Sequence, residues 1–265
     1  MRIVLLGHYD IASNIALSLL ATAMPQHRYS VMLSGTVPST VPALAALSAC
    51  ERKLCDDLAN SAGRQPGSLL SFEALAGRTE SRVLALPEPN SPEGLEVLAR
   101  SRPDLIISVR YRRILKEAAL SIPELGVLNL HSGLLPEYKG VMATFWAMLN
   151  NEGFIGSTLH YVVDGSIDTG PIVARAAMPA DRRRSYLANV LALYPAGCKR
   201  VVEAVRRLEH GEAVACRPQL PGGCYYSAPS GEKVLQFQQA GLRLFDGDEL
   251  QQFLQERMTG EDPQR

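Results

Sequence analysis

Hydrophobic and polar positions along this chain form two repeating patterns, and the first of them is a short apolar run. Runs such as "RIVLLG" are typical of strands buried on both faces of a parallel sheet, because neither face of such a strand meets water. Runs of this kind occupy residues 2–7, 29–35, 82–87, 104–109 and 126–130. We predict a strand at each of these positions.

The second pattern is a helical spacing of apolar residues in the segments between these runs. In residues 10–24, isoleucine and leucine recur every four positions, and Asp10 is placed to cap the helix. Residues 43–63 are also typical of a helix, with Gly63 as its stop. Both segments are therefore predicted to be helical.

A further helix is expected over residues 90–103. Asn90 is placed to cap it, and Pro92 would lie in its first turn. Glu93 stands three residues after this cap, which is the spacing of a capping box. These signals place the start of the helix at Asn90.

Strands and helices alternate through the first half of the chain, which is the order of a parallel sheet with right-handed crossovers. Two later apolar runs, 157–163 and 171–178, are expected to pair around the loop 164–170. Residues 185–211 have the spacing of one long helix, with a kink or break at Pro195. We predict an α/β fold, a Rossmann-like mostly parallel sheet with helices on both faces.

The last part of the chain changes character. After the long helix it is rich in proline and glycine, and a short amphipathic pattern follows at 250–258. From Thr259 onward we expect disorder. We predict a main domain over residues 1–210 and a small C-terminal appendage over residues 211–265.

Composition narrows the classes of function. The chain has 265 residues, 46% of them apolar, and 27 Lys and Arg balance 27 Asp and Glu. A neutral chain argues against a general nucleic-acid-binding protein. The five cysteines lack CxxC spacing, so we expect neither a metal site nor a disulfide framework. No apolar stretch is long enough for a membrane span, and the N-terminal run is too short for a signal peptide. We expect a cytoplasmic protein.

The candidate chemistry is concentrated in "NLHSGLLPEYKG", residues 129–140. Side chains alternate faces along a strand, so Asn129 and His131 are expected on the same side. They lie at the carboxyl end of a strand, where open α/β sheets bind ligands. Asp164 and Asp168 follow in a loop that can fold back over this end. An amide, an imidazole and a carboxylate that converge there suit acyl transfer to an amine.

Each of these signals also has a structural interpretation. Asn-x-His pairs commonly hydrogen-bond within a loop, and Asp168 could belong to a simple turn. His160 lies in an alternating strand, where a structural role is favoured. Residues 182–184, three arginines, are typical of an exposed loop before a helix. His8 follows the first strand, where it could meet a substrate phosphate or lie on the surface.

The stretch "LNLHSGLLPEYKG" followed by "DGSIDTGPI" resembles the folate-dependent formyltransferase family. This family includes glycinamide ribonucleotide, methionyl-tRNA and sugar N-formyltransferases. The resemblance extends in order over residues 1–210 and assigns the family's catalytic trio to Asn129, His131 and Asp168. One departure concerns the loop after the histidine, which in the family lies beside the oxyanion of the reaction. Pro-Ser or Gly-Ser usually follows the histidine in the family, and this chain has Ser-Gly there.

The segment "VRYRRIL", residues 109–115, resembles the family's folate-binding strand end. The resemblance implies pterin contacts from Arg113, Ile114 and Leu115, and a loop contact from Asp164. The implied co-substrate is 10-formyltetrahydrofolate. The first strand and helix lack a GxGxxG motif, so we expect no nicotinamide cofactor.

The activity that the resemblance implies is transfer of the formyl group to the amine of a small metabolite, with a nucleotide-linked amino sugar as the first candidate. The tRNA-acting members carry a larger C-terminal barrel than this tail allows, and a neutral chain argues against tRNA. Tyr225 and Tyr226 could stack on the acceptor, or they could cover an edge of the core. The tail could also form the edge of a homodimer.

Two alternatives stay open. A hydrolase of 10-formyltetrahydrofolate would use the same trio with water as the acceptor. Such enzymes usually carry an additional N-terminal regulatory domain, whereas this chain begins at the first strand. A non-catalytic protein that binds folate or a nucleotide is the second alternative, and the intact trio argues against it.

Overall fold

The structure is a computed structural model, and it describes residues 1–36, 38–61, 69–76 and 83–259. Its strands are β1 (Arg2–His8), β2 (Arg28–Ser34), β3 (Leu84–Ala85), β4 (Leu105–Ser108), β5 (Val127–His131), β6 (Tyr138–Gly140), β7 (Phe154–Val162), β8 (Ile172–Pro179) and β9 (Cys224–Tyr226). Its helices are α1 (Ile11–Ala23), α2 (Pro42–Ser61), α3 (Phe72–Ala76), α4 (Pro92–Arg100), α5 (Glu117–Leu120), α6 (Ala143–Leu149), α7 (Tyr186–Glu209), α8 (Gly231–Gln239) and α9 (Gly247–Thr259).

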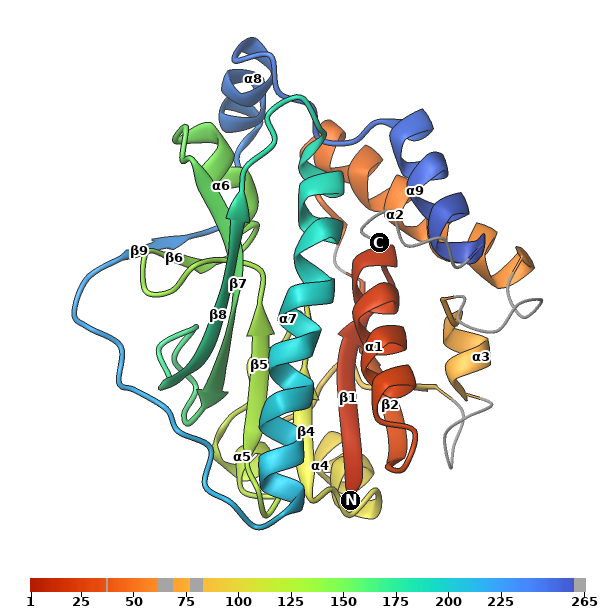
Figure 1. Cartoon of the computed structure of the whole chain (residues 1–265), viewed down its shortest axis with the longest axis vertical. Helices are drawn as coiled ribbons and strands as arrows, with labels where there is room; N and C mark the ends of the chain where they lie inside the picture. Colours follow the sequence, from red (N-terminus) through yellow and green to blue (C-terminus); the bar gives the residue numbers. More distant parts are fainter. Residues whose placement is uncertain (37, 62–68, 77–82, 260–265) are drawn as a thin grey trace.

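Seven strands form one twisted sheet in the order β3-β2-β1-β4-β5-β7-β8 (Figure 1). The pairs from β3 to β5 are parallel, and β7 is antiparallel to both β5 and β8. The strand pair expected around the loop 164–170 is therefore β7 and β8. A second, two-stranded parallel ribbon joins β6 to β9. The predicted α/β fold with a mostly parallel sheet is confirmed.

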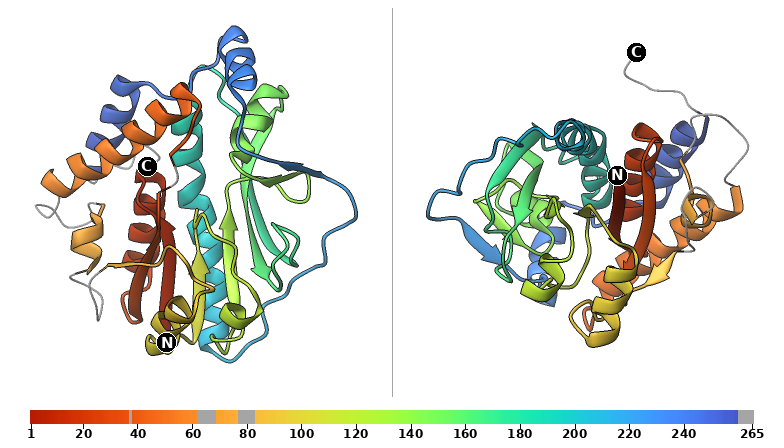
Figure 2. Two further views of the ribbon diagram at one scale, coloured as in Figure 1. Left: turned by 180° about the vertical axis from the view of Figure 1, so that it is seen from behind. Right: turned by 90° about the horizontal axis from the view of Figure 1, so that it is seen from below.

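The two faces of the sheet are covered by different helices. Along β1, Ile3 and Leu5 belong to the larger core, which α1 and α7 cover. The alternate residues Val4 and Leu6 belong to a smaller core with α4 and α5. α1 and α7 lie side by side on their face of the sheet (Figures 1 and 2). This burial on both faces explains why the strands are continuous apolar runs.

The helix caps confirm one prediction and correct another. Asp10 caps α1, because its Oδ1 accepts the Ser13 N–H at 2.7 Å. The cap of α4 is Ser91, and Asn90 instead donates to the Ile114 carbonyl and accepts the Lys116 N–H, both at 2.8 Å. The predicted capping box is therefore wrong, although a proline does stand in the first turn of α4. The Asn90 side chain is occupied by the backbone of Ile114 and Lys116, so the neighbouring Ser91 caps the helix.

α7 runs unbroken from Tyr186 to Glu209 through Pro195, so the predicted break is absent. The helix approaches the sheet closely at Gly197, where an added Cβ would lie 2.6 Å from Ser157 Oγ. Across the described ranges, no helix is both long and apolar enough to cross a bilayer. The stop predicted at Gly63 and the end of the chain from Gly260 lie outside the described residues.

The tail after α7 packs onto the main core. Phe237, Leu242 and Leu250 are nearly fully buried and belong to the larger core cluster. In Figure 1, α9 lies beside α2, and α8 stands above α6. The division at residues 210 and 211 stays a prediction, and the helices of the tail share their core with the main sheet.

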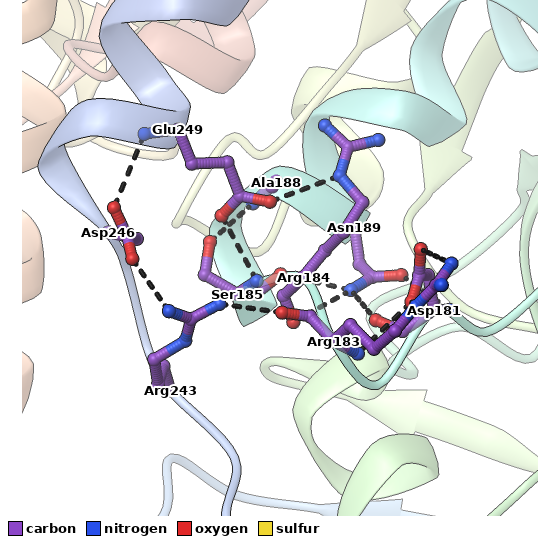
Figure 3. A network of polar contacts seen from close by, with 9 residues as sticks. All are labelled: Asp181, Arg183, Arg184, Ser185, Ala188, Asn189, Arg243, Asp246 and Glu249. Carbon is purple, nitrogen blue, oxygen red and sulfur yellow. Dashed lines mark hydrogen bonds and ion pairs between the residues drawn. The ribbon is translucent and has the colours of Figure 1, made fainter.

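The tail also completes the start of α7 (Figure 3). The Ser185 N–H donates to Glu249 Oε2 at 3.1 Å, and the Tyr186 N–H donates to the Arg243 carbonyl at 2.7 Å. The Ala188 N–H donates to the Ser185 hydroxyl at 3.2 Å. The first N–H groups of a helix have no partner within it, so the tail satisfies donors that α7 cannot satisfy alone.

Candidate active site

β5 carries two polar side chains toward one face of the sheet. Leu128 and Leu130 belong to the core under α7. The strand period of two then directs Asn129 and His131 to the opposite face. Antiparallel pairing with β7 sets His160 directly across from Asn129. The register therefore brings a second imidazole into the site, whereas the sequence favoured a structural role for it.

Asp168 reaches this group from the loop between β7 and β8. Its Oδ2 accepts the Gly140 N–H at 2.8 Å and lies 3.5 Å from His131 Nδ1. Its Oδ1 lies 3.4 Å from both Asn129 Nδ2 and His160 Nε2. The expected convergence of Asn129, His131 and Asp168 is thus present in the geometry. Among the described residues, no cluster of His, Cys, Asp or Glu is arranged to hold a metal ion.

The His131 ring is held at both nitrogens. Nε2 lies 2.7 Å from the Tyr138 carbonyl, which can only accept, so Nε2 carries a hydrogen. A ring protonated on both nitrogens therefore faces an acceptor on each side, because Asp168 lies beside Nδ1. The departure from the family sequence matters here: a Cβ added at Gly133 would lie 2.6 Å from His131 Nε2. The glycine leaves room for the ring.

His160 orients the amide of the site. Its Nδ1 lies 2.9 Å from the Tyr161 carbonyl and so carries a hydrogen. Nε2 of the neutral ring is then free to accept the Asn129 amide N–H at 3.0 Å. This bond fixes which end of the Asn129 side chain is the donor. The sequence predicts a strand over residues 157–163 but not its pairing with the strand of Asn129, so it does not select His160.

Asp168 is held as a carboxylate. Burial raises its pKa, but the charge of His131, the contact with His160 and the Gly140 N–H together lower it to about 2. Its backbone has φ 54°, in the left-handed region that only glycine adopts without cost. Contacts elsewhere must hold such a conformation, which is common where function constrains the backbone.

The residues expected to contact the folate donor make different kinds of contact in the structure. Ile114 is 48% exposed and lies next to the loop of Asp168, since a Cβ added at Gly165 would lie 3.8 Å from it. Arg113 donates to the Pro87 carbonyl at 2.7 Å. Leu115 is only 5% exposed and packs in the smaller core, so its side chain serves the fold.

Asp164 lies in the same loop and is exposed. Its Oδ1 accepts the Ser166 N–H at 2.7 Å, which stabilises the turn before Asp168. The loop contact expected from Asp164 stays a prediction.

A second polar cluster occupies the carboxyl ends of β1 and β4, the point where the strand order reverses. Arg110 Nε lies 2.9 Å from Asp10, and its other end lies 2.8 Å from Glu51. Arg112 reaches Asp10 at 3.4 Å. His8 is buried against this cluster, and burial together with Arg112 lowers its pKa to about 4. His8 is therefore not a surface residue.

Comparison with known proteins shows which family and relatives the segment with this arrangement is similar to. The model of the family described as formyl transferase matches residues 60–189, the segment that carries all of the trio. The methionyl-tRNA formyltransferase of Aromatoleum aromaticum is 34% identical over 163 residues, which are 58% of this chain and 50% of that protein. Residues 60–189 match the formyl transferase family. The chain spans about half the length of the Aromatoleum aromaticum relative.

Two solved structures share the fold of this chain. Glycinamide ribonucleotide transformylase 1 from Symbiobacterium toebii is 19% identical with a TM-score of 0.58, covering 83% of this chain and 94% of its own. The formyltransferase PseJ from Anoxybacillus kamchatkensis is 17% identical with a TM-score of 0.53, covering 94% and 97%. At these identities the likeness is one of fold.

The tail tyrosines differ in exposure. Tyr226 stacks between Tyr138 and Trp146, with ring centroids 5.3 and 5.0 Å away, so it covers the core as one interpretation expected. Tyr225 is 57% exposed, and its ring would lie 2.9 Å from a Cβ added at Gly140. Tyr225 therefore leaves an aromatic face open beside the backbone that binds Asp168.

Proposed function

We propose that this chain transfers a formyl group from 10-formyltetrahydrofolate to the amine of a small metabolite. The observation that carries the proposal is the meeting of Asn129, His131 and an ionised Asp168 on one open face of the sheet. The match of residues 60–189 to the formyl transferase family supports the same chemistry. In this proposal the trio is catalytic and the residues around Ile114 bind the donor.

The first step is attack of a neutral amine on the formyl carbon, which converts the formyl oxygen to an oxyanion. The Asn129 amide and a doubly protonated His131 are the donors that stabilise this charge. Their contacts to Asp168 measure 3.4 and 3.5 Å, long for hydrogen bonds, so the donors can exchange to a stronger acceptor. Such contacts commonly tighten only when substrate is bound.

The second step moves one proton from the attacking nitrogen to the leaving nitrogen of the folate. Asp168 is the base that lies among the donors, and its low pKa keeps it ionised at neutral pH. It accepts the amine proton, directly or through water, and returns it as the bond between carbon and the folate nitrogen breaks. The products are a formamide and tetrahydrofolate, and no proton is left over.

The donor site of this proposal lies on the loop side of the trio. Ile114, Val163 and Ile167 expose 48%, 60% and 37% of their surface around the loop that carries Asp168. Exposed apolar side chains of this kind suit a flat heterocycle such as a pterin. The description of the PseJ structure names bound tetrahydrofolate, which supports the same co-substrate here.

The acceptor class that we favour is a nucleotide-linked amino sugar. The description of the PseJ structure names a UDP-linked formamido sugar, which is the formylated form of such an acceptor, together with tetrahydrofolate. In this chain the open ring of Tyr225 offers a stacking face on the Gly140 side of Asp168. Curated relatives such as the Aromatoleum aromaticum protein are named methionyl-tRNA formyltransferases, and they make aminoacyl-tRNA the competing acceptor.

Incubation with 10-formyltetrahydrofolate separates these functions. We expect turnover only when an amine acceptor is added, with a mass gain of one formyl group on an amino-sugar nucleotide. Rapid release of formate without an acceptor would favour the hydrolase. Binding of folate without turnover on any amine would favour the non-catalytic binder.

The acceptor panel must include aminoacylated initiator tRNA at physiological salt. Efficient formylation of the tRNA with no turnover on small amines would overturn the acceptor class and leave the formyl-transfer chemistry in place. His131→Ala serves as the inactive control in every assay, since it removes the imidazole and leaves the donor loop unchanged.

A further inference from the structure

The tail segment between α7 and β9 passes the start of β8 and then loops outward before it reaches β9 (Figure 1). Arg217 makes a two-way backbone bridge with Ile172, with both hydrogen bonds 2.8 Å long. Two residues later, Gln219 Nε2 donates to the Asp168 carbonyl at 2.7 Å and to the Gly170 carbonyl at 2.9 Å. The tail therefore binds the backbone of the loop that carries the carboxylate.

The same tail holds the opposite side of the site through β9. The parallel pair of β9 and β6 is extended by the Val141 N–H, which donates to the Tyr226 carbonyl at 2.8 Å. β6 supplies both backbone groups that fix the trio. These are the Tyr138 carbonyl at His131 and the Gly140 N–H at Asp168. Tail and trio are thus connected on two sides.

We propose that Gln219 is a positioning residue that holds Asp168 in its left-handed turn. A non-glycine residue at φ 54° relaxes to another conformation unless its backbone is fixed, and Gln219 fixes the carbonyls of residues 168 and 170 together. With the backbone fixed, the carboxylate stays directed at Nδ1 of His131. Relaxation of the turn would move it away.

The orientation of the Gln219 amide supports this role. Both of its hydrogen bonds are donated by Nε2, and both acceptors are carbonyl oxygens. Its Oε1 is buried and has no partner among the described residues. A buried unpartnered oxygen is unfavourable, so the two donated bonds decide how the side chain lies. The effect on turnover rests on the proposed function, whereas the effect on the loop does not.

The test compares Gln219→Met with the wild type. Met has a similar length and no donor, and the matched control Gln238→Met changes an exposed glutamine of α8 in the same tail. We expect hydrogen exchange of the backbone amides in residues 164–170 to rise about tenfold, and the ¹⁵N signals of the His131 ring to move, in Gln219→Met alone. Turnover should fall about tenfold with KM for the folate within about twofold.

A second variant keeps the test decisive if Gln219→Met does not fold. In Gln219→Glu, the protonated acid can still donate one hydrogen bond, and the ionised acid faces two carbonyl oxygens with none to donate. The His131 ring signals should match the wild type below pH about 4 and depart from it, reversibly, above pH about 5.

Unchanged exchange in residues 164–170 and unchanged His131 ring signals in both Gln219 variants would overturn the positioning role. A wild-type protein that shows no formyl transfer would overturn the proposed function instead. The exchange and ring measurements would still decide the role of Gln219, because neither depends on turnover.

Discussion

The sheet carries two buried polar clusters at its carboxyl end, and they differ in the kind of cation that faces each carboxylate. At the end of β1 and β4, Asp10 and Glu51 face the guanidinium of Arg110. At the end of β5, Asp168 faces two imidazoles and an amide. The first cluster pairs its carboxylates with a guanidinium, which always stays charged, whereas the second places imidazoles, which can act as acids and bases, beside its carboxylate.

The kind of group that faces each carboxylate indicates the role of a cluster better than its position in the fold does. The point where the strand order reverses is the usual ligand crevice of an open α/β sheet, and here Arg110 occupies it with its ion pairs. Asp10 is only 2% exposed at its side chain and Glu51 only 3%, so both carboxylates are buried against Arg110. The β5 cluster keeps long, exchangeable contacts around Asp168. We therefore assign stability to the first cluster and chemistry to the second.

The largest expected effect is the loss of stability in Arg110→Met. The change leaves Glu51 buried without its ion pair to Arg110, and breaking a buried pair in this way costs about 3–5 kcal/mol. Because burial raises the pKa of Glu51 to about 7, the loss should be larger at pH 8, where the acid is ionised, than at pH 6. Urea unfolding at the two pH values measures both.

Arg112→Met is the matched control for this prediction. Its side chain is 36% exposed and lies 3.4 Å from Asp10, so it should cost under about 1 kcal/mol. Equal losses in the Arg110 and Arg112 variants would mean that burial of the ion pairs does not distinguish the two arginines.

The next effect concerns turnover at the β5 cluster. Asn129→Ala, His131→Ala and Asp168→Ala should each lower turnover roughly a hundredfold or more, because each removes a donor or the base of the proposed transition state. Steady-state rates with a verified acceptor measure the loss, and circular dichroism checks the fold. Glu51→Gln, in the other cluster, should leave turnover within about threefold. Near-normal rates in all three alanine variants would show that the trio is not catalytic.

Local patterns explain what could be predicted from the sequence. The strands follow from short continuous apolar runs and the helices from apolar residues four positions apart, and both are properties of neighbouring residues. The shared face of Asn129 and His131 follows from the alternation of side chains along a strand. The loop pattern offered Asp164 and Asp168 alike, and only resemblance to a family chose Asp168, because no local pattern places a loop over a strand end.

Contacts between segments that are distant in the sequence explain which features could not be predicted from it. His160 joins the site through its register opposite Asn129, and Asn90 left its expected cap for the backbone of Ile114 and Lys116. Gln219 lies 51 residues from Asp168 in the sequence, and nothing near it signals the contact. Each of these side chains could have a role within its own segment, but in the structure each one contacts a segment that is distant in the sequence.

The smallest expected effect compares the pH dependence of stability in Asp168→Asn with the wild type. The pKa of Asp168 falls from 3.8 to about 2 in the folded protein. A carboxyl whose pKa is lowered by folding adds stability above its unfolded pKa, and this is lost as the pH falls through the folded value. The added stability is about 2 kcal/mol above pH 4 and should vanish as the pH approaches 2.

Urea unfolding of both proteins between pH 2 and pH 6 measures this difference in stability. The other acidic residues are present in both proteins, so their contribution cancels in the difference. The titratable groups in contact with the carboxylate are His131 and His160. The wild type should be the more stable protein at pH 5, and the two curves should converge toward pH 2. Curves that stay parallel over the whole range would mean that the imidazoles do not hold Asp168 in its charged form, and the contrast with the Arg110 cluster would then lose its electrostatic basis.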